Sequence, residues 1–207
     1  MDVSTGPLTG FGWQLIGGDL AVDLVNTVAY RTDPSRTVDR LADLRHLADW
    51  LAVAAPRHGW PVNLSSRSLA GSSRRDALDE VRRLREAVAA VLNAQVDGEQ
   101  PPGEAIELIR RSYEDALTRA VVPPRLPLRY EVEVQSTDEA PTLLALAAGR
   151  LCTRHDLERL QRCAASDCGW YFLDTSRNRS RRWCDPGDCG NRTRVRAFAA
   201  RQRAGSR

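Results

Sequence analysis

Four of the five cysteines form two pairs with the same spacing. Four residues separate Cys163 from Cys168, four separate Cys184 from Cys189, and fifteen lie between the two pairs. Zinc binds thiolates in a tetrahedron, and two short loops that each carry two cysteines are a common way to supply the ligands. Because four cysteines fill the coordination shell, the spacing predicts one structural Zn²⁺ ion rather than a catalytic one.

Two other interpretations of these cysteines remain open. They could be unrelated thiols of a reduced protein, or they could form a redox-sensitive disulfide. A disulfide framework is not expected, because the cysteine count is odd and the first residues, MDVSTGPLTGFGWQ, have neither the basic segment nor the apolar segment of a secretory signal. Cys152 lies in an apolar stretch and is expected to be buried.

Arginine is concentrated around the cysteines. All 30 basic residues are arginine, and residues 150–207 hold 14 of them against six acidic residues, a net charge of +8. Residues 1–149 hold 16 against 21, a net charge of −5. This asymmetry predicts a polyanionic partner, such as DNA, for the C-terminal end. The expected DNA contacts are Arg177, Asn178, Arg179, Arg181 and Arg182 on a hairpin, and Arg192, Arg194 and Arg196 on the helix that follows Cys189.

Most of the remaining sequence has the periodicity of amphipathic helices. Apolar residues recur at helical spacing in five segments: 19–30, 39–55, 73–96, 101–120 and 141–153. Pro56 is expected to stop the second of these helices. Residues 128–135, LRYEVEVQ, alternate like a half-buried strand, and GWYFLD after Cys168 is expected to form a short strand. FGWQLI near the N-terminus reads as a short strand or an extended lead-in.

These patterns predict an α+β protein with two parts. The first, residues 1–155, is a mainly helical body with a small β-sheet. The second, residues 156–207, is a four-cysteine zinc finger in which a knuckle, a hairpin and a helix follow the order of a treble clef. Hydrophobic residues at 42% and charged residues at 28% are typical of a globular protein, and no apolar run is long enough to span a membrane. We therefore expect a cytoplasmic protein without a membrane partner.

The cysteine segment resembles a known family. The run CAASDCGWYFLDTSRNRSRRWCDPGDCGNRTRVRAFAAR is similar to the CGNR zinc finger, whose signature stands at 189–192. The body resembles the ABATE domain through Gly17-Gly18 and the run LAVDLVNT. The resemblance implies a bacterial, stress-induced transcription regulator that binds zinc and DNA. The sequence departs from the family pattern at Asp185-Pro186-Gly187-Asp188, between the last two cysteines. This difference should change the conformation of the knuckle loop but not the binding of zinc.

The sequence is also compatible with functions other than DNA binding. A basic zinc module could instead bind RNA or another protein, and a body of this kind could dimerise or sense a small-molecule effector. The candidate effector-binding residues are Trp13, Asp23, Asn26, Thr27 and Arg31. Catalysis is not expected: the three histidines stand in no metalloprotease motif, and neither a nucleophile elbow nor a phosphate-binding loop is present in the sequence.

Overall fold

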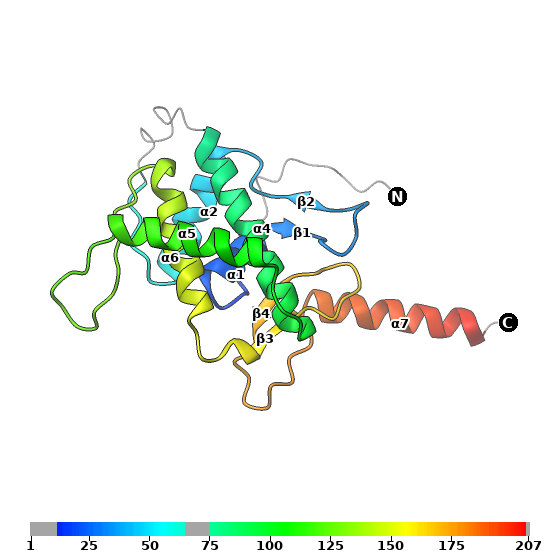
Figure 1. Cartoon of the computed structure of the whole chain (residues 1–207). Coiled ribbons are helices and arrows are strands. Elements are labelled where there is room, and N and C mark those ends of the chain that lie inside the picture. Colours follow the sequence, from blue (N-terminus) through cyan, green and yellow to red (C-terminus); the bar gives the residue numbers. More distant parts are fainter. Residues whose placement is uncertain (1–11, 65–74, 206–207) are drawn as a thin grey trace.

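The structure, a computed structural model, describes residues 12–64 and 75–205. Two antiparallel pairs of strands accompany the helices, β1 (Val28–Ala29) with β2 (Val38–Asp39) and β3 (Leu160–Arg162) with β4 (Tyr171–Leu173). Helices dominate and the sheets are small, which confirms the predicted α+β class (Figure 1). The helices are α1 (Leu20–Val25), α2 (Leu44–Arg57), α4 (Arg75–Asp97), α5 (Gly103–Arg119), α6 (Ala140–Cys152) and α7 (Cys189–Gly205), with short 3-10 turns η2 (Thr137–Glu139) and η3 (Leu157–Arg159).

The short helix α1 lies at the centre of the body. All six of its residues are buried, and it packs against α4, α6 and β4 (Figure 1). Asp19 caps its N-terminus, because the Asp19 carboxylate accepts a hydrogen bond of 2.9 Å from the backbone N–H of Ala21. A helix buried on every side must be apolar all round, and LAVDLV meets this requirement except at Asp23.

The helices α5 and α6 approach each other closely at a glycine. A Cβ atom placed on Gly149 would lie 2.2 Å from Cδ2 of Tyr113. This position within α6 therefore has no room for a side chain, and the ring of Tyr113 fills the space that the glycine leaves.

Several elements differ from the sequence-based expectation. The predicted strand 128–135 is wrong, because only Glu131 makes an isolated bridge, to Val121. Alternation alone does not form a strand when no neighbouring segment offers a continuous edge. The first helix ends at Val25 rather than near residue 30, since the chain turns into β1 at Val28. The second begins only at Leu44 and continues past Pro56 to Arg57. Residues 12–16 form no strand and are an extended lead-in.

The strand β4 is hydrogen-bonded to the body by a side chain. Asn26, which follows α1, donates from Nδ2 to the carbonyl oxygen of Tyr171 at 2.8 Å, and its Oδ1 accepts from the Tyr171 N–H at 2.9 Å. These are the two bonds that a neighbouring strand would make. The body also supplies the next hydrogen bond along this edge of β4, since the Leu173 N–H donates to the carbonyl of Gly17 at 2.9 Å.

The side chains of β4 divide between two apolar clusters. Tyr171 and Leu173 belong to the main core that also holds α1, α4 and α6. Phe172, fully buried, and the preceding Trp170 belong to a second cluster built around four cysteines. Because successive strand residues point to opposite faces, one three-residue strand joins the helical body to the cysteine cluster.

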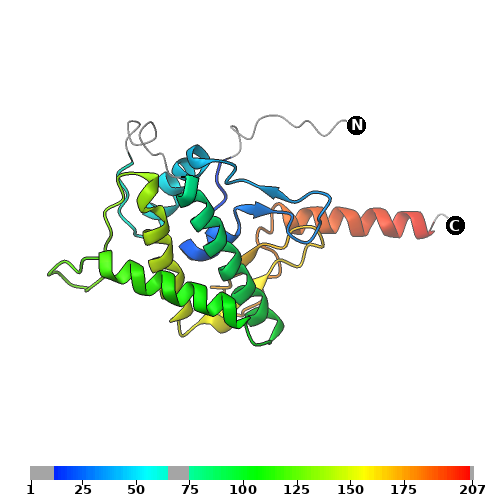
Figure 2. The same cartoon turned by 45° about the horizontal axis from the view of Figure 1, so that its top comes forward.

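One helix extends away from the rest of the molecule. Both orientations show α7 projecting as a rod beyond the body (Figures 1 and 2). Within the described residues, no helix combines the length and apolar character needed to cross a membrane.

Replacing Asn26 with Ala is expected to lower the free energy of unfolding by about 2–6 kcal/mol, since two buried backbone groups of Tyr171 lose their partners at about 1–3 kcal/mol each. Chemical denaturation followed by circular dichroism measures this loss. Asn178→Ala, at an exposed position, is the matched control and should change stability by less than about 0.5 kcal/mol. Equal stability of the two variants would contradict the role assigned to Asn26.

Candidate metal centre and nucleic-acid interface

The four paired cysteines converge on one point. Their Sγ atoms all lie within 4.8 Å of one another, with 3.6 Å between Cys168 and Cys184 and 3.5 Å between Cys184 and Cys189. A tetrahedral site with Zn–S bonds of about 2.3 Å has sulfur–sulfur edges of about 3.8 Å. All four cysteines are buried, so the arrangement fits one structural Zn²⁺ ion with a closed coordination shell. Cys152 lies outside this cluster and is exposed, contrary to the expectation that it is buried.

The first cysteine pair is held by the ends of β3 and β4. Cys163 directly follows β3 and its N–H donates to the Trp170 carbonyl at 2.8 Å, while the N–H of Cys168 closes a turn onto Ala165 at 3.1 Å. Gly169 then adopts φ +70°, where its missing Cβ would lie 3.0 Å from Cβ of Arg31. The glycine therefore permits both the turn and the close approach of the body.

The second cysteine pair is ordered by Asp185, the first residue of the loop that departs from the family pattern. The Asp185 carboxylate accepts hydrogen bonds from the N–H groups of Gly187 at 2.7 Å and Asp188 at 3.2 Å. The Asp185 carbonyl accepts from the N–H of Gly190 at 3.0 Å. The sequence Asp-Pro-Gly-Asp thus forms a self-bonded loop that places Cys189 as the first residue of α7.

Two of the arginines that are expected to contact DNA also make hydrogen bonds within the finger. Arg192 donates from Nη2 to Sγ of Cys189 at 3.0 Å. The guanidinium of Arg181 stacks on the Phe172 ring, 4.2 Å from its centroid, and donates to the carbonyls of Trp183 and Cys184. Donors of this kind orient metal ligands and offset the negative charge of the thiolates. Arg181 is therefore committed to the finger itself.

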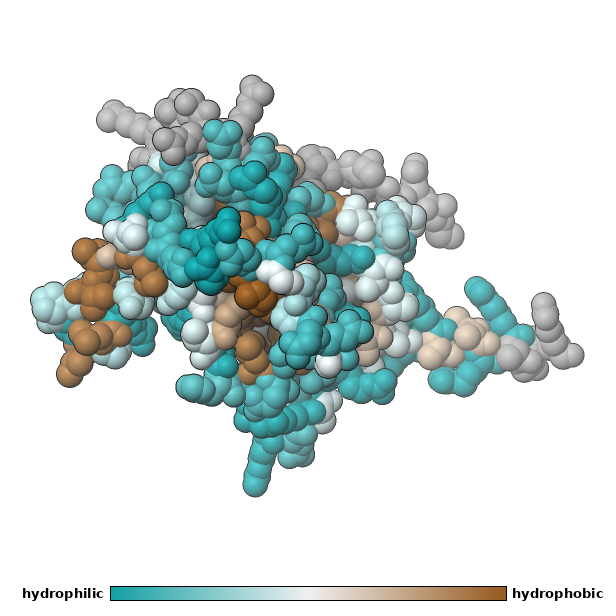
Figure 3. Space-filling view, in the orientation of Figure 1, coloured by the Kyte–Doolittle hydropathy of each residue, from teal (hydrophilic) through white to brown (hydrophobic). Residues whose placement is uncertain are grey.

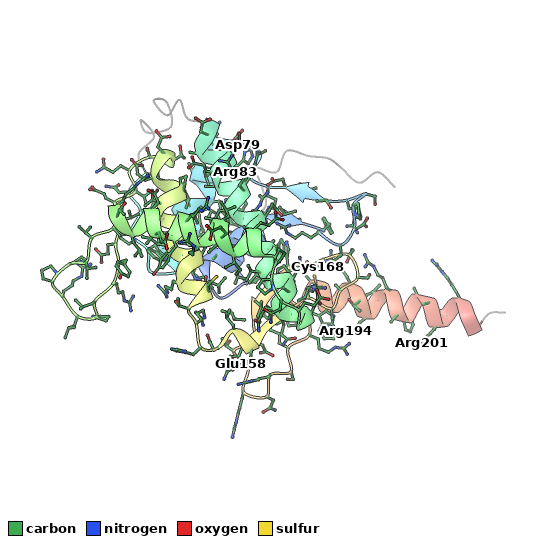
Figure 4. The ribbon with its side chains drawn as sticks, in the orientation of Figure 1. Asp79, Arg83, Glu158, Cys168, Arg194 and Arg201 are labelled. Carbon is green, nitrogen blue, oxygen red and sulfur yellow. The ribbon has the colours of Figure 1, made fainter. Side chains whose placement is uncertain are left out.

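The other predicted DNA contacts lie on two projections. In the loop 174–183, Arg177 and Asn178 are exposed, Arg179 pairs with Glu158 at 3.2 Å, and Arg182 is exposed beside Trp183. On α7, Arg194 is exposed and, in the view with side chains, lies on the part of the helix near the cysteines, while Arg201 lies farther out (Figure 4). The eight residues therefore lie on a loop and a helix, where the sequence analysis expected a hairpin and a helix.

Arg196 ties α7 to the body through a shared carboxylate. Asp167 accepts from Arg196 at 2.8 Å and from Arg36, in the loop between β1 and β2, at 2.7 Å. The hydrogen bond from Arg196 lowers the pKa of Asp167 to about 2, with Arg36 adding to the effect against the opposing influence of burial. The carboxylate therefore stays charged at neutral pH and joins three segments of the chain.

A row of residues on α7 was missed or misplaced by the sequence analysis. Val195 and Phe198 have the apolar character and spacing of residues that face a core, yet their exposed fractions are 59% and 56%. Asn191 is exposed on the same side of the helix, because successive helical residues are 100° apart. The 3.6-residue period was visible in the sequence, but the direction in which the helix leaves the body was not.

The polar residues proposed to bind an effector are bonded to the protein itself. Asp23 binds His58 Nε2 and the Gly17 N–H, both at 2.7 Å, and Asn26 binds Tyr171 as described. Thr27 donates to the Leu24 carbonyl, and Arg31 pairs with Glu86 at 2.8 Å. The ring of Trp13 lies 4.5 Å from the guanidinium of Arg40. An effector site at these five positions stays a prediction.

Comparison with known families accounts for both parts of the chain. A family model named ABATE, described as "putative stress-induced transcription regulator", matches residues 18–166. A second model, the CGNR zinc finger, matches residues 159–202. The two matches overlap at β3 and Cys163. No curated protein matches the sequence.

Replacing Cys184 with Ser is expected to reduce bound zinc from one ion per chain to almost none, because three thiolates no longer close the tetrahedron. Metal analysis of the purified protein measures this. The unfolding midpoint should fall as well, since Trp170 and Phe172 pack on the cysteines. Cys152→Ser is the control and should retain one zinc ion. Stoichiometric zinc in the Cys184 variant would refute the ligand assignment.

Proposed function

The chain belongs to the ABATE family and carries a CGNR zinc finger, and from this premise we propose that it regulates transcription by binding duplex DNA through α7 and the loop 174–183. The observation that carries the proposal is α7, an arginine-rich helix that projects from the zinc site with its apolar residues exposed (Figures 1 and 2). Helices of this kind enter the major groove, which admits one helix.

The charge of the finger supports a DNA partner. Residues 150–207 have a net charge of +8 with neutral cysteines, and a zinc ion with four thiolates contributes about −2, which leaves about +6. Affinity for DNA comes largely from the release of counterions when such charges meet phosphates. Zinc orders the finger and thereby holds α7 and the loop in fixed positions, so DNA binding depends on zinc.

The surface pattern of α7 matches a groove. At 100° per residue, two rows of arginine flank one central stripe. The stripe offers amides that suit adenine and apolar groups that suit the methyl of thymine, while the flanking guanidinium groups can reach phosphates or guanine. The stripe consists of Asn191, Val195, Phe198 and Gln202, one flank of Arg194 and Arg201, and the other of Arg192, Arg196 and Arg203.

The structure offers less support for RNA binding by base stacking. Trp170 and Tyr171 are buried, with exposed fractions of 8% and 2%, and Trp183 is half-buried next to Gly190. Stacking on single-stranded bases needs exposed aromatic faces. These three rings instead pack around the zinc ligands and the core.

We extend the proposal to a homodimer that acts in the cytoplasm. A single module buries only about 600–1,000 Å² on DNA, so two copies would raise both affinity and specificity. Exposed apolar side chains gather in the loop between α5 and α6, among them Val121, Leu126 and Leu128, and form a brown patch at the end opposite α7 (Figure 3). Sedimentation with and without operator DNA tests whether the chain dimerises.

The proposal is tested by selecting duplexes from fragmented genomic DNA with the zinc-loaded full-length protein, followed by a salt titration on each enriched fragment. Enrichment of a few fragments with steep salt dependence is the expected result. Failure of metal-loaded protein to enrich any duplex would reject DNA binding and leave a protein-binding or RNA-binding finger as the alternative.

The double substitution Arg194→Ala and Arg201→Ala is expected to reduce the slope of log affinity against log salt by about 2, because each arginine neutralises about one phosphate. Arg45→Ala with Arg83→Ala removes the same charge from exposed body positions and should leave the slope unchanged. Equal slopes for the two double variants would move the interface away from α7.

Asn191→Ala should relax base preference at one position with little change in slope.

A further inference from the structure

A cavity lies between the β1–β2 hairpin and the first turn of α7. Its volume is about 240 Å³, below the range of about 300–1,000 Å³ that is usual for drug-sized ligands. The hairpin contributes Tyr30, Val38 and Arg40 to its wall, and the finger contributes Trp170, Cys189 and Arg192. None of the five residues named as effector-binding candidates lines this cavity.

Arg40 is a half-buried cation without an acidic partner among the described residues. Its guanidinium lies over the Trp13 ring at 4.5 Å, and burial lowers the pKa of Arg40. By contrast, the buried Arg85 has acidic partners: it pairs with Asp39 at 2.7 Å and with Glu86 at 2.8 Å. A charge taken out of water without a partner is costly, so the Arg40 site favours a ligand that brings a negative charge.

A second cationic group lies across the cavity. The Nε atom of Arg192 is buried without a hydrogen-bond partner, although Nη2 of the same residue binds Cys189. Asp188, 3.4 Å from Arg192 Nε, also lines the cavity. Its carboxylate opposes a doubly charged ligand such as a phosphate, and the site is therefore suited to a single negative charge.

Two aromatic residues in the cavity wall are fixed in position. Trp170 donates from Nε1 to the Val28 carbonyl at 2.9 Å, which leaves its ring rather than a donor for a ligand. Tyr30 has a φ of +56°, a conformation that is strained for a bulky residue, and Arg36 stacks on its ring at 4.0 Å. Strained residues held in place by their neighbours cluster at ligand sites.

We propose that this cavity binds a small aromatic monocarboxylate, with the carboxylate on Arg40 and the aromatic ring between the hairpin and the finger. A planar carboxylate matches the donor geometry of a guanidinium, and one ring fits the volume. Such a ligand would bridge the hairpin and α7, the two elements that Asp167 already joins through Arg36 and Arg196. An effect of the ligand on DNA affinity rests on the function proposed above, whereas the binding of the ligand to the cavity does not.

The experiment uses zinc-loaded full-length protein without DNA, with benzoate as the probe and benzamide as its uncharged counterpart. Calorimetry and tryptophan fluorescence follow binding, and metal analysis confirms that zinc is retained. Benzoate is expected to bind with one site per chain and at least tenfold more tightly than benzamide. Binding of both with equal affinity, or of neither at millimolar concentration, would overturn the proposal.

Two variants place the site. Arg40→Gln should weaken benzoate at least tenfold and leave benzamide unchanged, whereas Val38→Trp should exclude both by filling the cavity. Arg45→Gln, on the exposed face of α2, is the matched control and should bind like the natural protein. If Arg40→Gln fails to fold, Val38→Trp alone decides, and unchanged benzoate affinity in it would overturn the site. A loss of DNA binding with benzoate binding intact would reject the proposed function and leave this site standing.

Discussion

The paired hydrogen bonds between Asn26 and the backbone of Tyr171 are the constraint on which the arrangement of the whole chain depends. A strand of three residues pairs with β3 along one edge only, and its other edge would leave buried backbone groups unsatisfied. The Asn26 amide supplies a donor and an acceptor at that edge, as a neighbouring strand would. Because β4 also carries Phe172 into the cysteine cluster, the end of α1 determines where the zinc site stands relative to the body.

The zinc site and the helical body consequently stabilise each other. The cluster around the four cysteines holds only a few apolar residues, Trp170 and Phe172 among them, which is too little to order a module of this size without metal. The body supplies the rest: Val28 accepts from the Trp170 indole, and Gly17 accepts from β4. A substitution that displaces β4 therefore affects the packing of both the main core and the cysteine cluster.

Local patterns in the sequence were enough to predict the zinc ligands and the long helices. Cysteine spacing identifies ligands because a knuckle is a local structure, and the apolar periodicity of α4 and α5 requires only that one face be buried. The strand predicted at 128–135 failed because a strand needs a partner that its own residues do not encode. Asn26 and Arg40 owe their environments to residues far away in the chain, which local patterns do not show. The charge of Arg181 is visible in the sequence, whereas its hydrogen bonds to the finger's own carbonyls are not.

The position of α7 at the zinc site explains how an exposed, arginine-rich helix is held in place. Cys189 is its first residue, so the partial positive charge of the helix N-terminus meets a zinc–thiolate cluster with a net charge of about −2. Arg192 adds a hydrogen bond to that cluster, and Arg203 in the last turn meets the partial negative charge of the C-terminus. What remains unfavourable is the repulsion among the arginines and the exposure of Phe198 to water. Both costs would fall if a polyanion covered the helix with thymine methyl groups against Phe198, and this is the physical argument for the DNA partner proposed above.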